Sequence, residues 1–458
     1  MKKGLLSVAA LLATVVGTAA LTSCGPKKPD SWKVDNTGKV INIRAWNDEF
    51  KRFFEKYVSD EKVDSKTPAG EPNPSAPKTY HLDGLPVNWS IVPSENAQYQ
   101  DALDQQLLLQ ADAAPEDKID MILAEADYIL KYAGSDTTQD VKALGVTDMS
   151  NTYNYTVQAA SDANGNVKGV SFQCCPSALI YNRVVARDVL GTDDPVEVQK
   201  HVSSWAKFDE TAAKMKAKNY FMTASVDDSY RVFSNNATTP WVNEKGEVTI
   251  PQSSKDWMEQ AKKYAKNGYT EICGVWDAAK NANIAADANK AFCCFGPAWY
   301  YNFCMGNSKA GDWAICEGPQ AHFWGGTWLL AAAGSDNTDA VAKIMNAFIN
   351  DQQVCENLIK NEGQFTNNQK ANAKVAAEYD RDGKGNTFLG GQNDTKLYLE
   401  LAKNIKFLNP TNYDQICNES LQQYYREFLN GDVTEEKAIE NFYKSLKNKY
   451  EELIVPVK

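Results

Sequence analysis

The side chains best suited to ligand binding in this sequence are tryptophans and carboxylates that follow apolar runs. Trp46, Asn47 and Glu49 come after one such run, and Glu125 and Asp127 come after another. An indole ring offers a flat apolar face and one polar N–H, which suits the C–H face of a sugar ring. Carboxylate and amide oxygens accept strong hydrogen bonds, which suits the hydroxyl groups around that ring. This combination indicates a site for a neutral mono- or oligosaccharide.

Structural roles compete with this interpretation. Trp46 could pack in the core, because tryptophan is highly buried on average. Asp127 could cap a helix expected to begin near Tyr128, a position that aspartate favours. Further tryptophans that could stack on a ligand are Trp241, Trp276, Trp299, Trp324 and Trp328. The last two flank Gly325-Gly326, where the missing side chains permit close approach of the backbone to a ligand.

Signatures of catalysis and of metal binding are missing from the sequence. It contains no GxSxG, P-loop or HExxH motif. Its three histidines, His81, His201 and His322, lie far apart, which argues against a His-rich zinc or iron site. The segment 380–385 resembles half of an EF-hand loop, but Lys384 stands where an acid or amide is required. We therefore expect no catalytic residue, no metal ligand and no cofactor.

The composition is that of a folded soluble protein without affinity for nucleic acid. Apolar residues make up 43% and charged residues 23% of the 458 positions. This length predicts about three domains or two large ones. The 59 acidic residues outnumber the 48 basic ones, giving a net charge of −11. Nucleic-acid binding needs clustered Lys and Arg, so this balance excludes it as an expected function.

The N-terminal pattern indicates a targeting segment. Lys2 and Lys3 precede the apolar run 5–20, which is short for a membrane span but suits a signal peptide. A short transmembrane anchor is the alternative. The run ends in Leu-Thr-Ser-Cys-Gly at 21–25, which resembles the bacterial lipobox and implies lipid on Cys24. More than one acyl chain would anchor the protein stably at the extracytoplasmic face of the cell membrane.

The cysteines that follow Cys24 show no metal or redox spacing. The nine are Cys174, Cys175, Cys273, Cys293, Cys294, Cys304, Cys316, Cys355 and Cys417. None forms a CxxC pair. Many lie in apolar stretches, so we interpret them as small buried hydrophobic side chains. One or two disulfides are the alternative, because an exported protein meets oxidants.

Hydrophobic spacing predicts the elements that position these residues. Strands at 40–46, 85–92 and 119–124 alternate with helices at 48–60 and 97–110. The β-α-β-α-β order predicts a parallel sheet covered by helices on both faces. A hairpin turn is expected at Asn164-Gly165 between strands at 156–160 and 167–172. Further expected elements are strands 178–181, 220–224, 291–295 and 328–333, helices 183–190, 195–218, 255–266, 338–349 and 434–453, and a proline-rich loop at 63–79.

From about residue 38 to its end, the chain resembles the family 1 extracellular solute-binding proteins, the substrate-binding lipoproteins of ABC importers, with the maltodextrin-binding type as their best-known relative. Four stretches in the family's order carry the resemblance: Ile41–Glu49, Asn164–Asn182, Ala291–Tyr300 and Asp312–Trp328. The sequence departs from the family at Cys174-Cys175-Pro176 and at Cys293-Cys294. Trp299 stands one residue beyond the family's Gly-Pro-Trp position.

The resemblance implies an α/β, two-lobed periplasmic-binding-protein fold of type II, with hinge-connected lobes and a ligand cleft between them. The expected divisions are signal peptide 1–23, tether 24–39, lobe 1 at 40–148 plus 318–365, and lobe 2 at 149–317 plus 366–458. The implied function is non-enzymatic: a lipid-anchored monomer captures a carbohydrate and delivers it to ABC transporter permease subunits. The expected ligand contacts are Trp46, Asn47, Glu49, Glu125, Asp127, Trp241, Trp299, Trp324 and Trp328.

Other functions stay open from the sequence. A secreted glycoside hydrolase would need two opposed carboxylates, about 5–5.5 or 6.5–9.5 Å apart. Glu125 and Asp127 come from one strand end and make a poor opposed pair. The same fold could instead bind ferric iron, with Tyr300 and Tyr301 as ligands, or a peptide.

Overall fold

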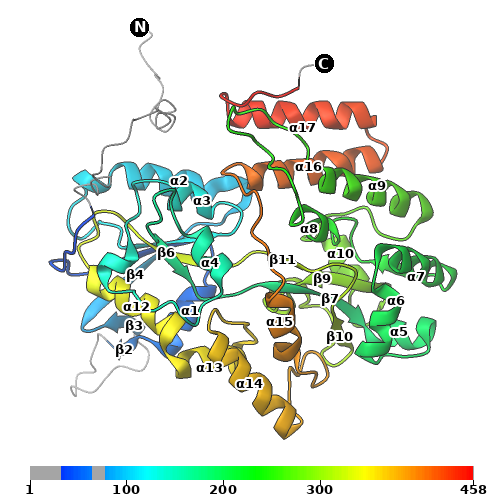
Figure 1. Cartoon of the computed structure of the whole chain (residues 1–458), viewed down its shortest axis with the longest axis horizontal. Coiled ribbons are helices and arrows are strands. Elements are labelled where there is room, and N and C mark those ends of the chain that lie inside the picture. The colour runs from blue at the N-terminus through cyan, green and yellow to red at the C-terminus, as the bar shows by residue number, and fades with distance from the viewer. Residues whose placement is uncertain (1–31, 64–77, 457–458) are drawn as a thin grey trace.

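The computed structural model describes residues 32–63 and 78–456. The expected lipid site Cys24, the expected signal peptide and most of the proline-rich segment lie outside the described residues. Within the described part, two α/β lobes lie side by side, each built around its own sheet (Figure 1). In that part, none of the helices combines the length and the apolar character needed to cross a bilayer. The mixed α/β, two-lobed architecture expected from the sequence is confirmed.

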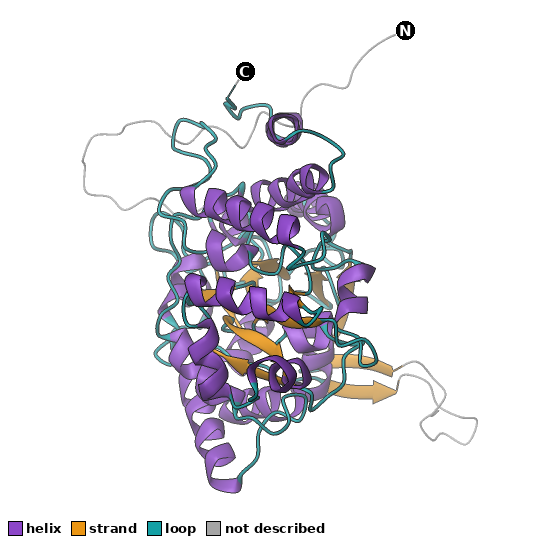
Figure 2. Cartoon of the chain, turned by 90° about the vertical axis from the view of Figure 1, so that its right-hand side faces the viewer, coloured by secondary structure: helices purple, strands orange, loops and turns teal. Residues whose placement is uncertain are grey.

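The first lobe contains a seven-stranded sheet in the order β2-β3-β4-β1-β5-β12-β6. Its strands are β1 (Ile41–Ala45), β2 (Asp60–Val63), β3 (Lys78–Leu82), β4 (Leu85–Ile91), β5 (Met121–Glu125), β6 (Gly169–Ser171) and β12 (Thr327–Ala331). Strand β1 runs parallel to β4 and β5, as expected, whereas β12 pairs antiparallel with β5 and β6. The β2–β3 ribbon, which flanks the proline-rich segment, projects from the body of the molecule (Figure 2).

Helices bury both faces of this sheet. They include α1 (Glu49–Tyr57), α2 (Gln98–Leu108), α3 (Ile129–Ala133), α4 (Asn154–Ala159) and α12 (Thr338–Asn350). In α1, Phe50, Phe53 and Phe54 recur at helical spacing and are almost fully buried. Phe50 packs on Phe348 of α12 with ring centroids 4.5 Å apart. The packing of α1 fixes Glu49, its first residue, at the end of β1.

The second lobe contains a five-stranded sheet in the order β10-β7-β9-β8, with β11 paired to β7. Its strands are β7 (Pro176–Asn182), β8 (Phe221–Thr223), β9 (Ala291–Gly296), β10 (Trp313–Cys316) and β11 (His322–Phe323). The remaining helices are α5 (Arg183–Leu190), α6 (Pro195–Val202), α7 (Trp205–Ala217), α8 (Tyr230–Ser234), α9 (Gln252–Asn267), α10 (Ala278–Asn283), α11 (Tyr300–Cys304), α13 (Gln352–Glu362), α14 (Gln369–Asp382), α15 (Asp394–Ala402), α16 (Asp414–Leu429) and α17 (Glu435–Lys449).

The sheet to which each strand belongs shows where the chain crosses from one lobe to the other. β6 still belongs to the first sheet and β7 to the second, so the first crossing lies at 172–175 rather than near 149. Gly169 makes the β6–β12 pairing possible, because a Cβ there would lie 2.3 Å from the carbonyl oxygen of Leu329. The chain returns to the first sheet between β11 and β12, at 324–326. An isolated β-bridge between Gln173 and Thr366 marks the third crossing between the lobes. We propose these crossings as the lobe boundaries.

Two local expectations are wrong. The segment expected as the first arm of a hairpin, 156–160, lies largely in α4, because Tyr155, Thr156 and Ala159 face the core at helical spacing. The turn at Asn164-Gly165 is present, with Asp162 accepting the Asn164 and Asn166 backbone N–H groups. The single helix expected at 195–218 is divided into α6 and α7, because the Ser204 hydroxyl accepts the backbone N–H of Lys207 and caps a new helix.

The cysteines behave as small hydrophobic side chains. All nine in the described residues are free and buried, so the disulfide alternative fails there. Burial raises the pKa of several of these thiols, that of Cys316 to about 12. Protonated thiols at these sites pack like other apolar groups and are poor nucleophiles.

Candidate functional site

Three tryptophans from separate segments meet at the boundary between the lobes. Trp299 lies at the N-terminus of α11, Trp324 in the crossing between β11 and β12, and Trp276 just before α10. Ring centroids lie 5.1 Å apart for Trp299 and Trp324 and 6.5 Å apart for the nearly parallel Trp276 and Trp299. The Trp299 indole N–H donates to the Trp324 carbonyl at 3.2 Å. With 61% of Trp276 exposed, this tryptophan cluster presents an aromatic surface to solvent.

The turn after β9 sets the position of Trp299. Gly296 ends that strand, and a Cβ there would lie 2.4 Å from Cγ of Tyr300. Because glycine leaves this space free, Tyr300 packs back against the strand, and its hydroxyl donates to Asp228 at 3.3 Å. The short helix α11 is thereby held against β9, and Trp299 is directed toward the first lobe.

Glu125, at the end of β5, reaches the tryptophan cluster from the first lobe. Gly325 adopts φ +73°, and a Cβ there would lie 3.2 Å from Glu125 Oε1 and 3.4 Å from Trp299 Cζ2. This glycine therefore allows the carboxyl and the indole to share one site. Burial, and next the negative charge of Asp127, raise the pKa of Glu125 to about 8. A carboxyl that holds its proton near neutral pH both donates and accepts hydrogen bonds.

Asp127 connects the two lobes through an ion pair. Its carboxylate accepts two hydrogen bonds from Arg231 of α8, at 2.8 and 2.5 Å. The Arg231 guanidinium also lies over the Trp324 ring, 5.7 Å from its centroid. The capping alternative for Asp127 fails, because α3 begins at Ile129 with Tyr128 as its N-cap residue, and no side chain caps it. The bidentate pair instead fixes the edge of the site.

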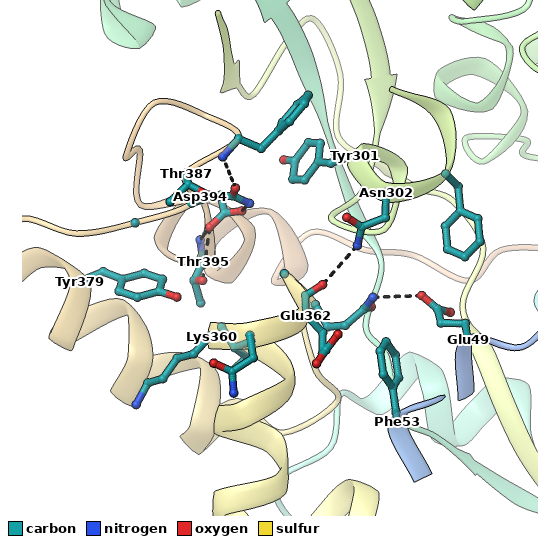
Figure 3. A pocket seen from close by; sticks show the side chains of 18 of the residues that line it. Glu49, Phe53, Tyr301, Asn302, Lys360, Glu362, Tyr379, Thr387, Asp394 and Thr395 are labelled. Atoms are coloured by element: carbon teal, nitrogen blue, oxygen red, sulfur yellow. Dashed lines mark hydrogen bonds between the residues drawn. The ribbon is translucent and has the colours of Figure 1, made fainter. Parts of the chain in front are cut away.

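A cavity of about 520 Å³ lies between the lobes on the side of α13 and α14, and we call it the hinge-side cavity (Figure 3). Glu49 and Phe53 of α1 line it from the first lobe. The segment 301–303 lines it from the second lobe, and 359–364 lies at the end of α13. Asn302 donates from its side chain to the Glu362 carbonyl at 3.2 Å, which connects two of these walls.

Glu49 joins this cavity to two crossing segments. Its carboxylate accepts hydrogen bonds from Gln364 at 3.0 Å and from Gln173 at 3.3 Å. Gln173 also donates to Gln364 at 2.8 Å. Only 6% of Glu49 is exposed, and burial raises its pKa to about 7. The three side chains form a buried network at the point where the chain passes between the lobes.

The remaining sequence candidates make other contacts in the structure. Trp46 is half-buried against Tyr99, with ring centroids 5.9 Å apart. The Asn47 side chain accepts the backbone N–H of Glu49 and fixes the start of α1. Trp241 is 5% exposed and beside a small cavity of about 50 Å³ that Asp127 also lines.

Trp328 lies in the core. It is 0% exposed, and its indole N–H donates to the Thr156 carbonyl at 2.8 Å. Every residue of β12 is buried, because helices cover both faces of its sheet. Trp328 therefore has no exposed surface that a ligand could contact.

The ferric-iron alternative finds no support in the geometry. Tyr300 and Tyr301 are buried, and both phenol groups are used internally: Tyr300 donates to Asp228, and Tyr301 shares a 2.5 Å hydrogen bond with Tyr398. Across residues 32–63 and 78–456, no group of three or more His, Cys, Asp or Glu side chains could hold a metal ion.

Several residues of the site escaped sequence reasoning. Arg231 sits in an ordinary helical sequence, and nothing there identifies Asp127, 104 positions away, as its partner. Gln173 and Gln364 are likewise unremarkable in sequence. Asn302 and Phe303 could have been found, because they lie three and four residues after Trp299 and close to the family-like Gly-Pro turn.

Comparisons with known proteins agree with this architecture. Residues 86–386 match a family model described as bacterial extracellular solute-binding protein. A binding protein from B. animalis subsp. lactis, solved with β-1,6-galactobiose, superposes with a TM-score of 0.62 at 16% identity, covering 92% of this chain and 100% of its own. The lacto-N-biose complex of a Bifidobacterium longum binding protein gives 0.64 at 12% identity, with the same coverages.

A maltose-bound protein of T. maritima superposes with a TM-score of 0.59 at 14% identity, covering 89% of this chain and 99% of its own. At such identities these structures show a shared fold. No curated protein matches the chain in sequence.

Proposed function

The chain belongs to the bacterial extracellular solute-binding proteins, and on that premise we propose that it captures a carbohydrate between its two lobes. One observation carries the choice of ligand: the half-buried Trp299 ring of the second lobe and the Glu125 carboxyl of the first both border the space at Gly325, and the exposed Trp276 ring lies next to Trp299. Stacking rings next to hydrogen-bonding carboxyls match the two kinds of surface on a sugar. The sugars bound to several proteins of the same fold support this proposal.

Capture occurs by closure of the lobes. Trp299 and Trp276 supply the stacking face from one lobe, while Glu125 supplies hydrogen bonds from the other. A ligand that touches both lobes favours the closed arrangement by its differential affinity for that state. The Asp127–Arg231 pair, which spans the same boundary, orients the acidic edge of the site.

The family is extracytoplasmic, and we propose that lipid on Cys24 holds this member at the membrane. As a monomer, it would deliver its sugar to the permease subunits of an ABC importer. The lipobox-like segment 21–25 supports the anchor, and the shared fold with transporter-associated binding proteins supports the delivery step. No catalytic step is needed for this role.

The glycoside hydrolase alternative is weaker on geometry. Glu125 and Asp127 leave the same strand end, and the Asp127 backbone N–H donates to Glu125 at 2.8 Å. Asp127 is also occupied by Arg231. Two such neighbours do not face each other across a glycosidic bond.

A thermal-shift screen of residues 25–458 tests the proposal, with mono- and oligosaccharides as ligands and with ferric iron and peptides as controls. A ligand that binds only the native state at 100 times its Kd adds about 2.7 kcal/mol to the free energy of unfolding. A rise in Tm with one sugar series is expected. A rise with iron or peptide alone would overturn the carbohydrate assignment.

A further inference from the structure

We propose that the ligand is an oligosaccharide that runs from the tryptophan cluster into the hinge-side cavity, where its further sugar units bind. The inference rests on the proposed function, because it assumes that the tryptophan cluster holds the first sugar unit. It adds a second subsite and a length requirement, neither of which the family assignment supplies.

An aromatic path connects the two places. Phe303 of α11 lines the cavity and lies next to Trp299, with ring centroids 6.2 Å apart. Trp276 is also a neighbour of Trp299, with ring centroids 6.5 Å apart. Phe303 is 42% exposed, so part of its ring is open to a ligand. Consecutive rings along one surface suit consecutive sugar units, since each ring can stack on one apolar sugar face.

The cavity has the size and lining for uncharged, hydroxyl-rich units. Its volume of about 520 Å³ falls in the range of small-molecule sites, roughly 300–1,000 Å³. Glu49 and Asp394 line it as buried carboxyls. Both accept hydrogen bonds from neutral groups: Glu49 from two glutamines, and Asp394 from the Asn386 side chain and the Thr395 backbone N–H. Hydroxyl groups of a sugar would complete the hydrogen bonding of such oxygens without adding charge.

The basic side chains of the cavity wall argue against an anionic ligand, because they are already paired. Lys360 bonds Glu356 and Glu378, at 3.3 and 2.7 Å. Arg52 lies 3.5 Å from the Asp48 carboxylate. Since these cations are neutralised by the protein, the wall has no strong positive charge to offer a phosphate or carboxylate. Hydrogen bonding to neutral hydroxyl groups remains the main polar interaction that the cavity can provide.

Isothermal titration of the chain against two length series tests the inference: glucose, maltose, maltotriose and maltotetraose, and galactose, β-1,6-galactobiose and β-1,6-galactotriose. In the series that binds, affinity should rise beyond the disaccharide. Phe303→Ala and Asn302→Ala should each lower the ratio of longest-ligand affinity to disaccharide affinity by about 3- to 10-fold. Val196→Ala, at a 68% exposed position on α6, is the matched control and should leave the ratio unchanged.

The outcomes separate this inference from the proposed function. The second subsite would be overturned if affinity stopped rising at the disaccharide. It would also be overturned if Phe303→Ala and Asn302→Ala, both folded, left the ratio of longest-ligand affinity to disaccharide affinity unchanged. In either case the proposal that the chain binds a sugar would remain. If the unmodified chain bound no sugar of either series or of the thermal-shift screen, both the second subsite and the proposed function would be overturned. Tm values of the variants, measured without ligand, show that each one folds.

Discussion

The two lobes present different chemistry to the space between them. The first lobe contributes carboxyl groups at strand ends: Glu49 after β1, and Glu125 and Asp127 at the end of β5. The second contributes aromatic rings, Trp276 and Trp299, from turns around α10 and α11. Neither surface alone matches a sugar, which has an apolar face and a polar rim. Tight binding of a sugar by the proposed site therefore requires both surfaces, and so requires the lobes to close.

The difference follows from how each surface is built. The acidic residues directly follow central strands of a sheet covered on both faces, so their backbone is fixed by strand pairing. The rings stand on turns, where Gly296 leaves space for Tyr300 and Gly325 leaves space beside the Trp299 indole. A rigid polar edge therefore faces an aromatic surface held by loops.

The largest expected effect is on the free energy of unfolding, and it distinguishes the core tryptophan from a tryptophan of the proposed site. Trp328→Ala should lower the free energy of unfolding by about 3–5 kcal/mol, because it removes a fully buried ring and leaves a cavity. Trp276→Ala, at a 61% exposed position, is the matched control and should change stability by no more than about 0.5 kcal/mol. Urea unfolding measures both values. Equal losses would contradict the assignment of the two rings.

Removal of the central ring tests the aromatic surface. Trp299→Ala should weaken sugar binding by about 30-fold, or about 2 kcal/mol, as expected for a binding hot spot. Trp299→Phe should retain part of the affinity, because a smaller ring still stacks. Titration calorimetry gives the affinities, and wild-type affinity in a folded Trp299→Ala protein would rule out stacking at this position.

The interlobe ion pair provides a milder test. Arg231→Gln should weaken the closed arrangement by roughly 1 kcal/mol, because the pair is charge-assisted but partly reached by solvent. Small-angle scattering of the ligand-free chain should show a larger radius of gyration. Glu197→Gln, which breaks an exposed pair with Lys200 inside α6, is the control. No change in scattering from Arg231→Gln would argue against a role of this pair in closure.

A pH-dependent effect is expected from the buried carboxyl of Glu49. Burial raises its pKa from 4.5 to about 7, so the folded protein keeps this proton while the unfolded chain releases it. Its contribution to stability is therefore present below pH 4.5 and is lost as the pH rises toward 7, at no more than about 1.4 kcal/mol per pH unit.

Glu49→Gln should flatten the fall in the free energy of unfolding between pH 5 and 7, measured by urea unfolding at each pH. Glu400→Gln, whose side chain is 66% exposed, is the control and should keep the wild-type slope. An unchanged slope in Glu49→Gln would show that Glu49 is ionised throughout this range.

Sequence reasoning succeeded where the determining interactions are local. The strands β1, β4, β5, β7 and β9 and the helices α1, α2, α5 and α12 fall close to their expected positions, because hydrophobic spacing and caps act within a few residues. It failed at 156–160, where burial against β12 favours a helix over the extended arm that the following turn suggests.

The sequence by itself determined the solute-binding fold, the buried character of the cysteines and the residue types of the proposed sugar site. Tertiary structure alone decided where each tryptophan lies: Trp299 at the lobe boundary and Trp328 in the core. It also paired Asp127 with Arg231, 104 residues away, and Glu49 with Gln364, 315 residues away. The reason is physical: local propensity fixes an element, but only the packing of the lobes brings distant segments together and sets which side chains remain open to a ligand.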